Sequence, residues 1–507
     1  MMKRKQIGIV LAVLILILLL PMQVFATDES GKCGENANWT LAADGTLTIS
    51  GTGDMEDYNF DAPAPWSDRE ISAVVVADGI TGVGAYAFYQ QKSIVSVQLA
   101  DTVTRLGVSA FAECEGLVRA NIPTGVTVLE TNVFNRCFLL ESVEIPDGVI
   151  SIGDGAFQYC EKLMSLHIPD SVENVGMSAF TGTGYTYNER NWTDGSLYCD
   201  GVLLYVRGMP ATSDGTPFAR SYTVKDGTRV IAANAFSGCA DFKTVHFPVS
   251  LISIGKNAFM DCSDLTEISL PDSVRLLDNF AFFECGKLER VTLSRSLKKL
   301  GASLFDQCFA LESVNIPAGV TEIGDYAFRH CRALTAITIP DSVERIGVEA
   351  FEDTGLTKLI VPETVKEIGA YAVGMRQVDY REEPDEYGLW FEYVPIDGFT
   401  LACVKNSAAY EYAEKNGITV ELIEGAKTGG FILGTAYALG DLNGDGRVNS
   451  VDARLALRAA ARLDTLSDFQ KTVGDVNGDG TVNSKDARLL LRAAAHLEAL
   501  PEKFFTA

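Results

Sequence analysis

The chain has 507 residues and a formal net charge of −25, because 67 acidic side chains outnumber 42 basic ones. So acidic a protein repels nucleic acid, which excludes nucleic-acid-binding functions. The length suffices for two or three ordinary domains, or for one long repeat array with attachments.

Residues 1–26 have the features of a secretory signal peptide. A basic start at residues 3–5 precedes an apolar run at 7–20, and a small-residue cleavage site follows at 24–26. An uncleaved membrane anchor is the alternative, but the apolar run is short for a spanning helix. Cleavage removes three positive charges and no acids, which changes the net charge from −25 to −28. We therefore expect a secreted protein without a membrane span after cleavage.

Residues 27–70 do not repeat and are predicted to form an N-terminal cap. The stretch NWTLAADGTLTISGTG predicts two short strands around an Asp44-Gly45 turn, and Trp39 and Trp66 lie in the same region. A repeat array needs such an atypical unit at its open end, because its apolar interior would otherwise be exposed.

Residues 71–375 repeat with a period of 23, which a buried-type Phe marks. A fixed period of this length predicts stacked units that bury their apolar faces only against their neighbours. The predicted fold class is an α/β repeat solenoid of short strands and short helical turns. The marking positions are Phe88, Phe111, Phe134, Phe157 and Phe180, then Phe236, Phe259, Phe282, Phe305, Phe328 and Phe351, with Val373 in the last slot.

The segment from Leu140 to Cys160 illustrates one repeat. LESVEIP alternates apolar and polar residues at strand period, and Pro146 with the following Asp-Gly pair ends the strand and turns the chain. Val149, Ile152 and Phe157 then return to the core, the last in a short helical turn that ends at Cys160. Each buried Phe contributes about 1.5–3 kcal/mol to stability.

The eleven cysteines would suggest disulfides in a secreted protein. Eight of them, however, lie three residues after the repeat Phe, and Thr183 and Thr354 occupy the same slot in other repeats. A disulfide partner could not be replaced in this way, so we expect buried thiols. The eight are Cys114, Cys137, Cys160, Cys239, Cys262, Cys285, Cys308 and Cys331. The pairing of Cys33, Cys199 and Cys403 stays open.

About 33 extra residues interrupt the repeats at 181–221. The Asp200-Gly201 pair between apolar segments predicts a hairpin. Such an insertion either projects from a binding face or packs on the solenoid, and both interpretations stay open.

Residues 376–424 are predicted to form a C-terminal cap. They indicate a strand, a helix over 407–415 with Ser407 as N-cap, a stop at Asn416-Gly417 and a closing strand. Residues 425–439 are predicted to be a linker.

The repeat pattern I-P-x-x-V-x-x-I-G-x-x-A-F-x-x-C, seen at 145–160 and 316–331, resembles the BspA-like bacterial leucine-rich repeats. The stretch at 398–418 is similar to the unit that closes such arrays, so the resemblance covers about residues 31–424. It implies binding or adhesion, with no common ligand and no catalytic residues.

Residues 440–507 contain a second repeat, with a period of 34. Acids and amides occupy loop positions 1, 3, 5, 9 and 12, a Gly at position 6 makes the turn, and position 7 offers its carbonyl, which predicts two Ca²⁺ loops. Asp replaces the usual Glu at position 12, and because its side chain is shorter, the metal site is expected to be narrower. The predicted ligands are Asp441, Asn443, Asp445, Arg447, Asn449 and Asp452 in the first loop, and Asp475, Asn477, Asp479, Thr481, Asn483 and Asp486 in the second.

A helix is expected after each loop, and the resulting small all-α arrangement resembles a type I dockerin, the module that attaches secreted proteins to cohesin domains of a scaffoldin. In that family, loop positions 10 and 11 and helix positions 18 and 22 contact cohesin. The family often has two hydroxyl residues at positions 10 and 11, whereas this chain has Ser-Val and Ser-Lys, which makes the two faces unequal. The corresponding residues are Ser450, Val451, Arg458 and Arg462, then Ser484, Lys485, Arg492 and His496.

These observations favour a non-catalytic protein-binding or adhesion protein of a cellulosome-like complex over two alternatives. A glycoside hydrolase is less favoured, since the chain has no GxSxG or HExxH motif. A polysaccharide-binding component is the other alternative. The outward strand positions are small or polar, which leaves the insertion, with Tyr185 and Trp192, as the possible sugar site. We interpret His167 and His246 as solvent-exposed histidines.

Overall fold

The computed structural model describes most of the predicted repeat region and caps, and parts of the C-terminal module. The predicted signal peptide and most of the predicted linker lie outside the described residues. Among the described helices, none is both long and apolar enough to cross a bilayer. The described ranges are 29–207, 221–380, 391–423, 437–438, 440, 442, 450–461, 470–471, 474–477, 480–494 and 504–505.

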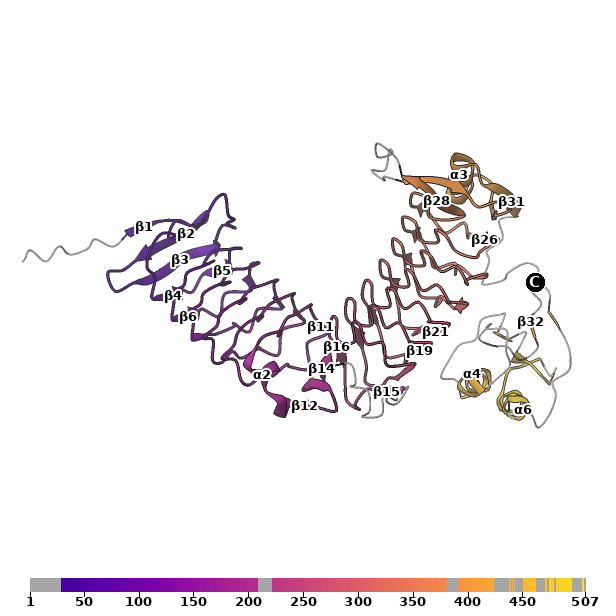
Figure 1. The fold of residues 1–507 in the computed structure, drawn as a ribbon, viewed down its shortest axis with the longest axis horizontal. Coiled ribbons are helices and arrows are strands. Elements are labelled where there is room, and N and C mark those ends of the chain that lie inside the picture. The colour runs from indigo at the N-terminus through magenta and orange to yellow at the C-terminus, as the bar shows by residue number, and fades with distance from the viewer. Residues whose placement is uncertain are drawn as a thin grey trace, which may run out of the picture. The chain divides into compact units, whose positions relative to one another are not determined.

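The chain divides into two compact units (Figure 1). The N-terminal unit comprises residues 1–148 and 157–164, and the C-terminal unit comprises residues 149–156 and 165–507.

The N-terminal unit begins with an antiparallel hairpin that leads into a parallel ladder (Figure 1). Strands β2 (Asn36–Leu41) and β3 (Thr46–Asp54) pair around the predicted turn, where Gly45 has a φ of 82°. The Asp44 carboxylate also accepts a hydrogen bond from the Thr46 N–H at 2.9 Å. Strand β3 then pairs in parallel with β4, the first strand of the repeats, so the parallel ladder of the array begins on the cap. The remaining strands of this unit are β1 (Glu29–Lys32), β4 (Ala73–Val76), β5 (Ile80–Val83), β6 (Ser96–Leu99), β7 (Arg105–Leu106), β8 (Arg119–Ala120) and β9 (Val128–Leu129).

The repeats form coils with two kinds of short strand. The first kind is the predicted Leu-x-x-Val-x-Ile strand, here β15 (Ser221–Thr223), β17 (Thr244–His246), β19 (Glu267–Ser269), β21 (Arg290–Thr292) and β23 (Ser313–Val314), which pair in parallel. The second kind, not predicted as a strand, ends at the apolar residue of the repeat's Ile-Gly position: β10 (Ser151–Ile152), β11 (Asn174–Val175), β16 (Val230–Ile231), β18 (Ser253–Ile254), β20 (Leu276–Leu277), β22 (Lys299–Leu300), β24 (Glu322–Ile323), β25 (Arg345–Ile346) and β27 (Glu367–Ile368). Two residues are too few to produce a period-two signal.

The repeat Phe residues form stacked columns in each unit. Phe88, Phe111, Phe134 and Phe157 are fully buried, and their successive ring centroids lie 5.1, 5.4 and 5.6 Å apart. The column from Phe236 to Phe351 stacks in the same way in the C-terminal unit. The predicted core role of these residues is confirmed.

The predicted helical turn around each Phe takes the form of successive tight turns. Tyr86 and Gln90, which flank Phe88, have φ values of 54° and 60°, and the same two slots are left-handed throughout the array. This conformation turns the N–H groups of Tyr86, Phe88 and Gln90 toward the next coil, where they donate to carbonyls at 2.8–2.9 Å. The backbone hydrogen bonds of these turns therefore run in one direction, which leaves turn carbonyls without these donors at the first coil and turn N–H groups without these acceptors at the last.

The cysteine slot completes this hydrogen-bonding pattern. The Cys114 thiol donates to the carbonyl of Phe88 at 3.1 Å, and most later repeats have the same contact at 3.1–3.2 Å. All eleven cysteines are buried free thiols, including Cys33, Cys199 and Cys403. Burial raises the thiol pKa, for Cys160 to about 12. The prediction of buried thiols is confirmed.

Each cap supplies the partners that the end of the array lacks. At the first coil, the Trp66 indole donates to the Ala87 carbonyl and the Tyr58 N–H to the Ala85 carbonyl, both at 2.8 Å. At the last coil, the Tyr412 hydroxyl lies 3.0 Å from both the N–H and the carbonyl of Val373. The ends are thus closed by donors on one side and by a hydroxyl on the other.

The insertion is part of the solenoid wall. It comprises α2 (Gly184–Tyr187), η1 (Glu189–Asn191), β12 (Trp192–Thr193), β13 (Ser196–Cys199) and β14 (Val202–Val206). Strands β13 and β14 form the predicted hairpin around Asp200-Gly201. Strand β14 also pairs in parallel with β16, and Leu203 is fully buried. The described part of the insertion, residues 181–207, therefore packs on the solenoid, while residues 208–220 lie outside the described residues.

The C-terminal cap has the predicted strand, helix and closing strand. These are β30 (Thr400–Val404), α3 (Ala408–Asn416) and β31 (Thr419–Ile423). Ser407 accepts a hydrogen bond from the Tyr410 N–H, and Gly417 ends the helix with a φ of 67°. Strand β26 (Lys358–Ile360) pairs with β30, while β28 (Met375–Tyr380) and β29 (Phe391–Pro395) form a hairpin that was not predicted.

The C-terminal module has two packed helices, α4 (Ser450–Ala460) and α6 (Ser484–Ala494), as expected after the two loops. Strands β32 (Tyr437–Ala438) and β33 (Phe504–Phe505) pair in antiparallel fashion. Its described core contains Leu442, Ala453, Leu455, Ala456, Val476, Ala487 and Leu490.

Candidate functional site

The second predicted calcium loop is organised around one buried carboxylate. Asp486 lies in the first turn of α6 and is fully buried. Its Oδ1 accepts the Asn477 N–H at 3.1 Å and its Oδ2 accepts the Asn483 N–H at 2.9 Å. These bonds tie positions 3, 9 and 12 of the loop together.

The turn of the same loop also matches the predicted pattern. The Asp475 carboxylate accepts the Gly480 N–H at 2.7 Å, and Gly480 has a φ of 86°, a conformation that favours glycine. The Asn483 amide donates to the backbone carbonyl of Thr481 at 3.1 Å and to its hydroxyl at 3.2 Å. The loop is therefore held by backbone N–H groups that donate to two carboxylates, Asp475 at its start and Asp486 at its end.

The described part of the first loop also has a buried carboxylate at position 12 that accepts a backbone N–H of the loop. Asp452, at position 12, is fully buried, and its Oδ1 accepts the Leu442 N–H at 2.9 Å. The other predicted ligands of this loop, and one of the second loop, lie outside the described residues: Asp441, Asn443, Asp445, Arg447, Asn449 and Asp479.

The donor set of the second loop fits Ca²⁺. Ca²⁺ prefers carboxylate, amide and carbonyl oxygens, which Asp475, Asn477, Thr481, Asn483 and Asp486 offer. A fully buried carboxylate also needs charge compensation, which a cation supplies. Within the described ranges alone, no three His, Cys, Asp or Glu side chains converge closely enough to hold a metal.

Four of the eight predicted cohesin-contacting side chains are described, and all four are exposed: Arg458, Ser484, Lys485 and Arg492. Ser450 and Val451 are described only as the start of α4, and Arg462 and His496 lie outside the described residues. Lys485 and Arg492 are seven residues apart on α6, which places them on one helix face. The cohesin contacts of these residues stay a prediction.

Two exposed leucines adjoin these arginines and were missed by the sequence analysis. Leu457 and Leu491 are 43% and 44% exposed and occupy equivalent positions in the two helices. Their repetition at the 34-residue period was the available signal. They give each helix an apolar group beside its basic one.

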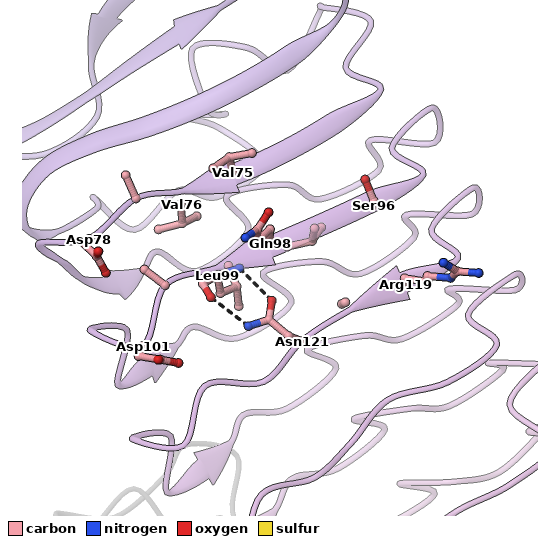
Figure 2. Close-up of a pocket in the computed structure, with 13 residues that line it drawn as sticks. Val75, Val76, Asp78, Ser96, Gln98, Leu99, Asp101, Arg119 and Asn121 are labelled. Atoms are coloured by element: carbon pink, nitrogen blue, oxygen red, sulfur yellow. Dashed lines mark hydrogen bonds between the residues drawn. The ribbon is translucent and has the colours of Figure 1, made fainter.

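The strand face of the N-terminal unit carries a hollow of about 850 Å³ over β4, β6 and β8 (Figure 2). The Asn121 amide accepts the Leu99 N–H and donates to the Leu99 carbonyl, both at 2.8 Å. Figure 2 shows the Asn121 side chain beside Leu99 of β6, with both hydrogen bonds drawn. Asp78, Asp101 and Arg119 lie exposed at the hollow, which therefore offers hydrogen-bonding and charged groups rather than rings.

The two aromatic residues considered for sugar binding are engaged within the insertion. The Arg207 guanidinium covers the Trp192 ring at 3.6 Å and pairs with Glu189. The Tyr185 hydroxyl donates to the Tyr198 carbonyl at 2.7 Å. The Trp192 ring thus has one face covered by a guanidinium, and both aromatic residues are half-buried.

The histidines interpreted as solvent-exposed are exposed. His167 lies 3.0 Å from the Asp200 carboxylate, which also accepts the Ile168 N–H and the Cys199 thiol. This order places the aspartate between thiol and imidazole, whereas a nucleophilic triad needs the imidazole in the middle. Burial moreover raises the Cys199 pKa to about 12.

These features define a bacterial-type repeat solenoid joined to a small module with paired polar loops. The profile described as BspA type leucine rich repeat region (6 copies) matches residues 66–186, 216–333 and 252–376. These ranges span more than half of the chain, which therefore belongs to this family. The profile of the dockerin type I domain matches residues 439–493. Both predicted resemblances are confirmed.

The two modules carry general properties. Type I dockerin domains bind calcium and cohesin domains, and leucine-rich repeats are a non-enzymatic kind of fold. Both modules are found in extracellular proteins. Together they indicate a protein-binding component of the cellulosome type.

Solved bacterial structures are similar to parts of this chain. A leucine-rich repeat protein from Eubacterium ventriosum is 23% identical, with a TM-score of 0.32, and the match covers 66% of this chain and 96% of that one. A leucine rich cell surface protein from Faecalibacterium prausnitzii is 21% identical, with a TM-score of 0.27 and coverage of 68% and 95%. The family assignment rests on the repeat profile and not on these scores. No curated protein matches the chain.

Proposed function

We propose that this is a secreted, non-catalytic protein that attaches through its dockerin to a cohesin-bearing scaffoldin and binds a protein ligand with its repeats. Residues 1–26 act as the signal peptide. The two dockerin loops each hold one Ca²⁺, with the twelve predicted residues as ligands. The observation that carries the proposal is the pair of buried position-12 aspartates, Asp452 and Asp486, each of which accepts loop N–H groups.

Both dockerin helices present a basic residue and a leucine at matching positions. This repetition supports two cohesin-binding faces, one with Leu457 and Arg458 and one with Leu491 and Arg492. Exposed Arg and apolar groups side by side are typical of interface centres.

The strand-face hollow supports a protein rather than a sugar as the ligand of that face. Its groups are amides, carboxylates and a guanidinium, which match the hydrogen-bonding groups of a peptide.

The test is calorimetric titration of the full chain with a panel of cohesin domains, in Ca²⁺ and in chelator. We expect tight binding that disappears on chelation. In two variants, Leu457→Ala with Arg458→Ala, or Leu491→Ala with Arg492→Ala, one face remains and binding survives; the four changes together abolish it. Binding by none of the cohesins in Ca²⁺ would contradict the attachment role.

A further inference from the structure

Three aromatic rings gather on the surface where the N-terminal cap meets the first coil. Phe60 is 70% exposed, and its ring centroid lies 5.2 Å from Tyr86 and 5.3 Å from Tyr89. The two tyrosines are 5.6 Å apart and lie on either side of the buried Phe88. Tyr86 and Tyr89 are half-buried, and the ring planes are inclined by 61–89° to one another, so Phe60 is the ring most open to solvent. An exposed aromatic side chain held by other rings in this way is typical of a binding surface.

Hydrogen-bonding groups border this aromatic triad. The Gln90 amide donates to the Glu113 carboxylate at 2.9 Å and to the Tyr89 hydroxyl at 3.2 Å. The Tyr89 hydroxyl also donates to the other oxygen of Glu113 at 3.4 Å. Aromatic rings and hydrogen-bonded polar side chains therefore lie next to each other on these turns.

The same slots of the next coils continue the polar border. The Asn135 amide donates to Asn132 at 3.3 Å and to Gln158 at 3.0 Å. The Arg136 guanidinium then lies over the Tyr159 ring, 5.6 Å from its centroid. We call the surface from the aromatic triad to Tyr159 the loop stripe. It lies wholly within the N-terminal unit.

The coil spacing sets the period of the loop stripe. Equivalent Phe rings in its coils are 5.1, 5.4 and 5.6 Å apart, and this is the translation from one coil to the next. That translation is close to the length of one pyranose residue in an extended polysaccharide. A sugar chain that runs along the coils thus meets an equivalent slot at each residue.

We propose that the loop stripe binds an extended, neutral polysaccharide chain that runs along the coil axis. The Phe60 ring, held edge-on by Tyr86 and Tyr89, stacks on the apolar C–H face of a pyranose, while the amides and Glu113 bind its hydroxyl groups. The ligand is expected to be neutral, because the loop stripe contains one acidic and one basic side chain, Glu113 and Arg136, and the net charge of −25 repels an anionic polysaccharide. This site goes beyond the proposed protein ligand of the strand face.

Affinity electrophoresis of the full chain in gels with hydroxyethylcellulose, xylan, glucomannan or mixed-linkage β-glucan tests the proposal. The informative variants are Phe60→Ala and Tyr86→Asn. Asn already occupies the Tyr86 slot at Asn132, Asn234 and Asn257, with φ values of 58°, 59° and 56°, so the backbone accepts it. Phe280→Asn, in the same slot of the C-terminal unit with a φ of 59°, is the matched control.

We expect at least one of these polysaccharides to retard the wild type, and each triad variant to weaken binding at least about tenfold. Binding of the matching oligosaccharides rises with length up to about four residues, one for each coil of the stripe. Phe280→Asn leaves binding unchanged.

Three results would overturn the proposal: no retardation in any gel, equal loss in Phe280→Asn, or retention of binding in both triad variants with an unchanged circular dichroism spectrum. Capture of only a protein ligand by the stripe counts against it as well. Chelation separates the two proposals, because it abolishes cohesin binding and leaves the loop stripe intact.

Discussion

The solenoid and the C-terminal module are both built from sequence repeats, but the solenoid repeats apolar core residues and the module repeats polar loop residues. Each coil contributes a fully buried Phe to a stacked column, so the array gains apolar burial with every repeat. The module repeats polar residues instead, and its described core holds seven small or aliphatic side chains and two buried aspartates. The apolar repeat therefore stabilises itself through its own stacked rings, whereas we expect the polar repeat to depend on a bound cation.

Removal of Ca²⁺ is expected to produce the largest difference in stability between the two regions. At a free concentration about 1,000 times the dissociation constant, each ion adds about 4 kcal/mol to the stability of the module. Asp441→Ala with Asp475→Ala, or chelation, should unfold the module and leave the solenoid transition unchanged in calorimetry. Loss of both transitions together would show that the two regions do not unfold independently.

The solenoid should instead be sensitive to its stacked rings. Phe157→Ala removes a fully buried ring and is expected to cost about 3–5 kcal/mol of the free energy of unfolding, measured with denaturant. Phe309→Ala is the control, since its side chain is 43% exposed and the cost should stay within about 1 kcal/mol. A cost below 1 kcal/mol for Phe157→Ala would refute the core assignment.

The end of the array offers a finer test of the one-directional hydrogen bonds. Tyr412→Phe removes the hydroxyl that contacts Val373 and should cost about 1–3 kcal/mol in thermal unfolding, because a buried N–H loses its acceptor. Tyr410→Phe removes a hydroxyl at an exposed contact with Glu414 and should change little. Equal effects in the two variants would mean that the cap hydroxyl has no special role.

The smallest expected effect concerns pH. Burial raises the pKa of Glu352, although the Gln377 N–H and His330, whose Nε2 lies 3.3 Å away, lower it. The folded state thus binds the proton more tightly than the unfolded state. The resulting stability is full below the unfolded pKa, near 4.5, and is lost as the pH rises through the folded value.

Glu352→Gln should therefore flatten the fall of the melting temperature between pH 4.5 and neutrality. The exposed Glu363→Gln is the control and should retain the wild-type slope. A wild-type slope in Glu352→Gln would contradict this role of the buried carboxyl.

Much of the fold was predictable because its signals are periodic or local. The 23-residue spacing of Phe predicted the stack, Asp44-Gly45 and Asp200-Gly201 predicted hairpins, and Ser407 predicted a helix start. The two-residue strands and the left-handed turns were missed. Tyr86 and Gln90 are residues that seldom adopt positive φ, and only hydrogen bonds to the next coil hold them there.

The candidate sites divide along the same line. The hydrogen-bonded loop around Asp475, Asn477 and Asp486 follows from spacing in one short segment, so it was predictable, whereas its role as a set of calcium ligands and the partner face of α6 stay predictions. The aromatic triad was not, because Phe60 and Tyr86 lie 26 residues apart in a cap and a coil that share no pattern.

The sequence by itself determined the repeat period, the buried thiol slot and the two polar loops of the dockerin, because each depends on residues a fixed distance apart in the chain. Only the tertiary structure decided that the insertion joins the sheet, that Trp66 and Tyr412 close the ends of the array, and that three rings meet at Phe60. These features depend on which coil lies beside which cap, and contacts between distant segments leave no spacing in the sequence.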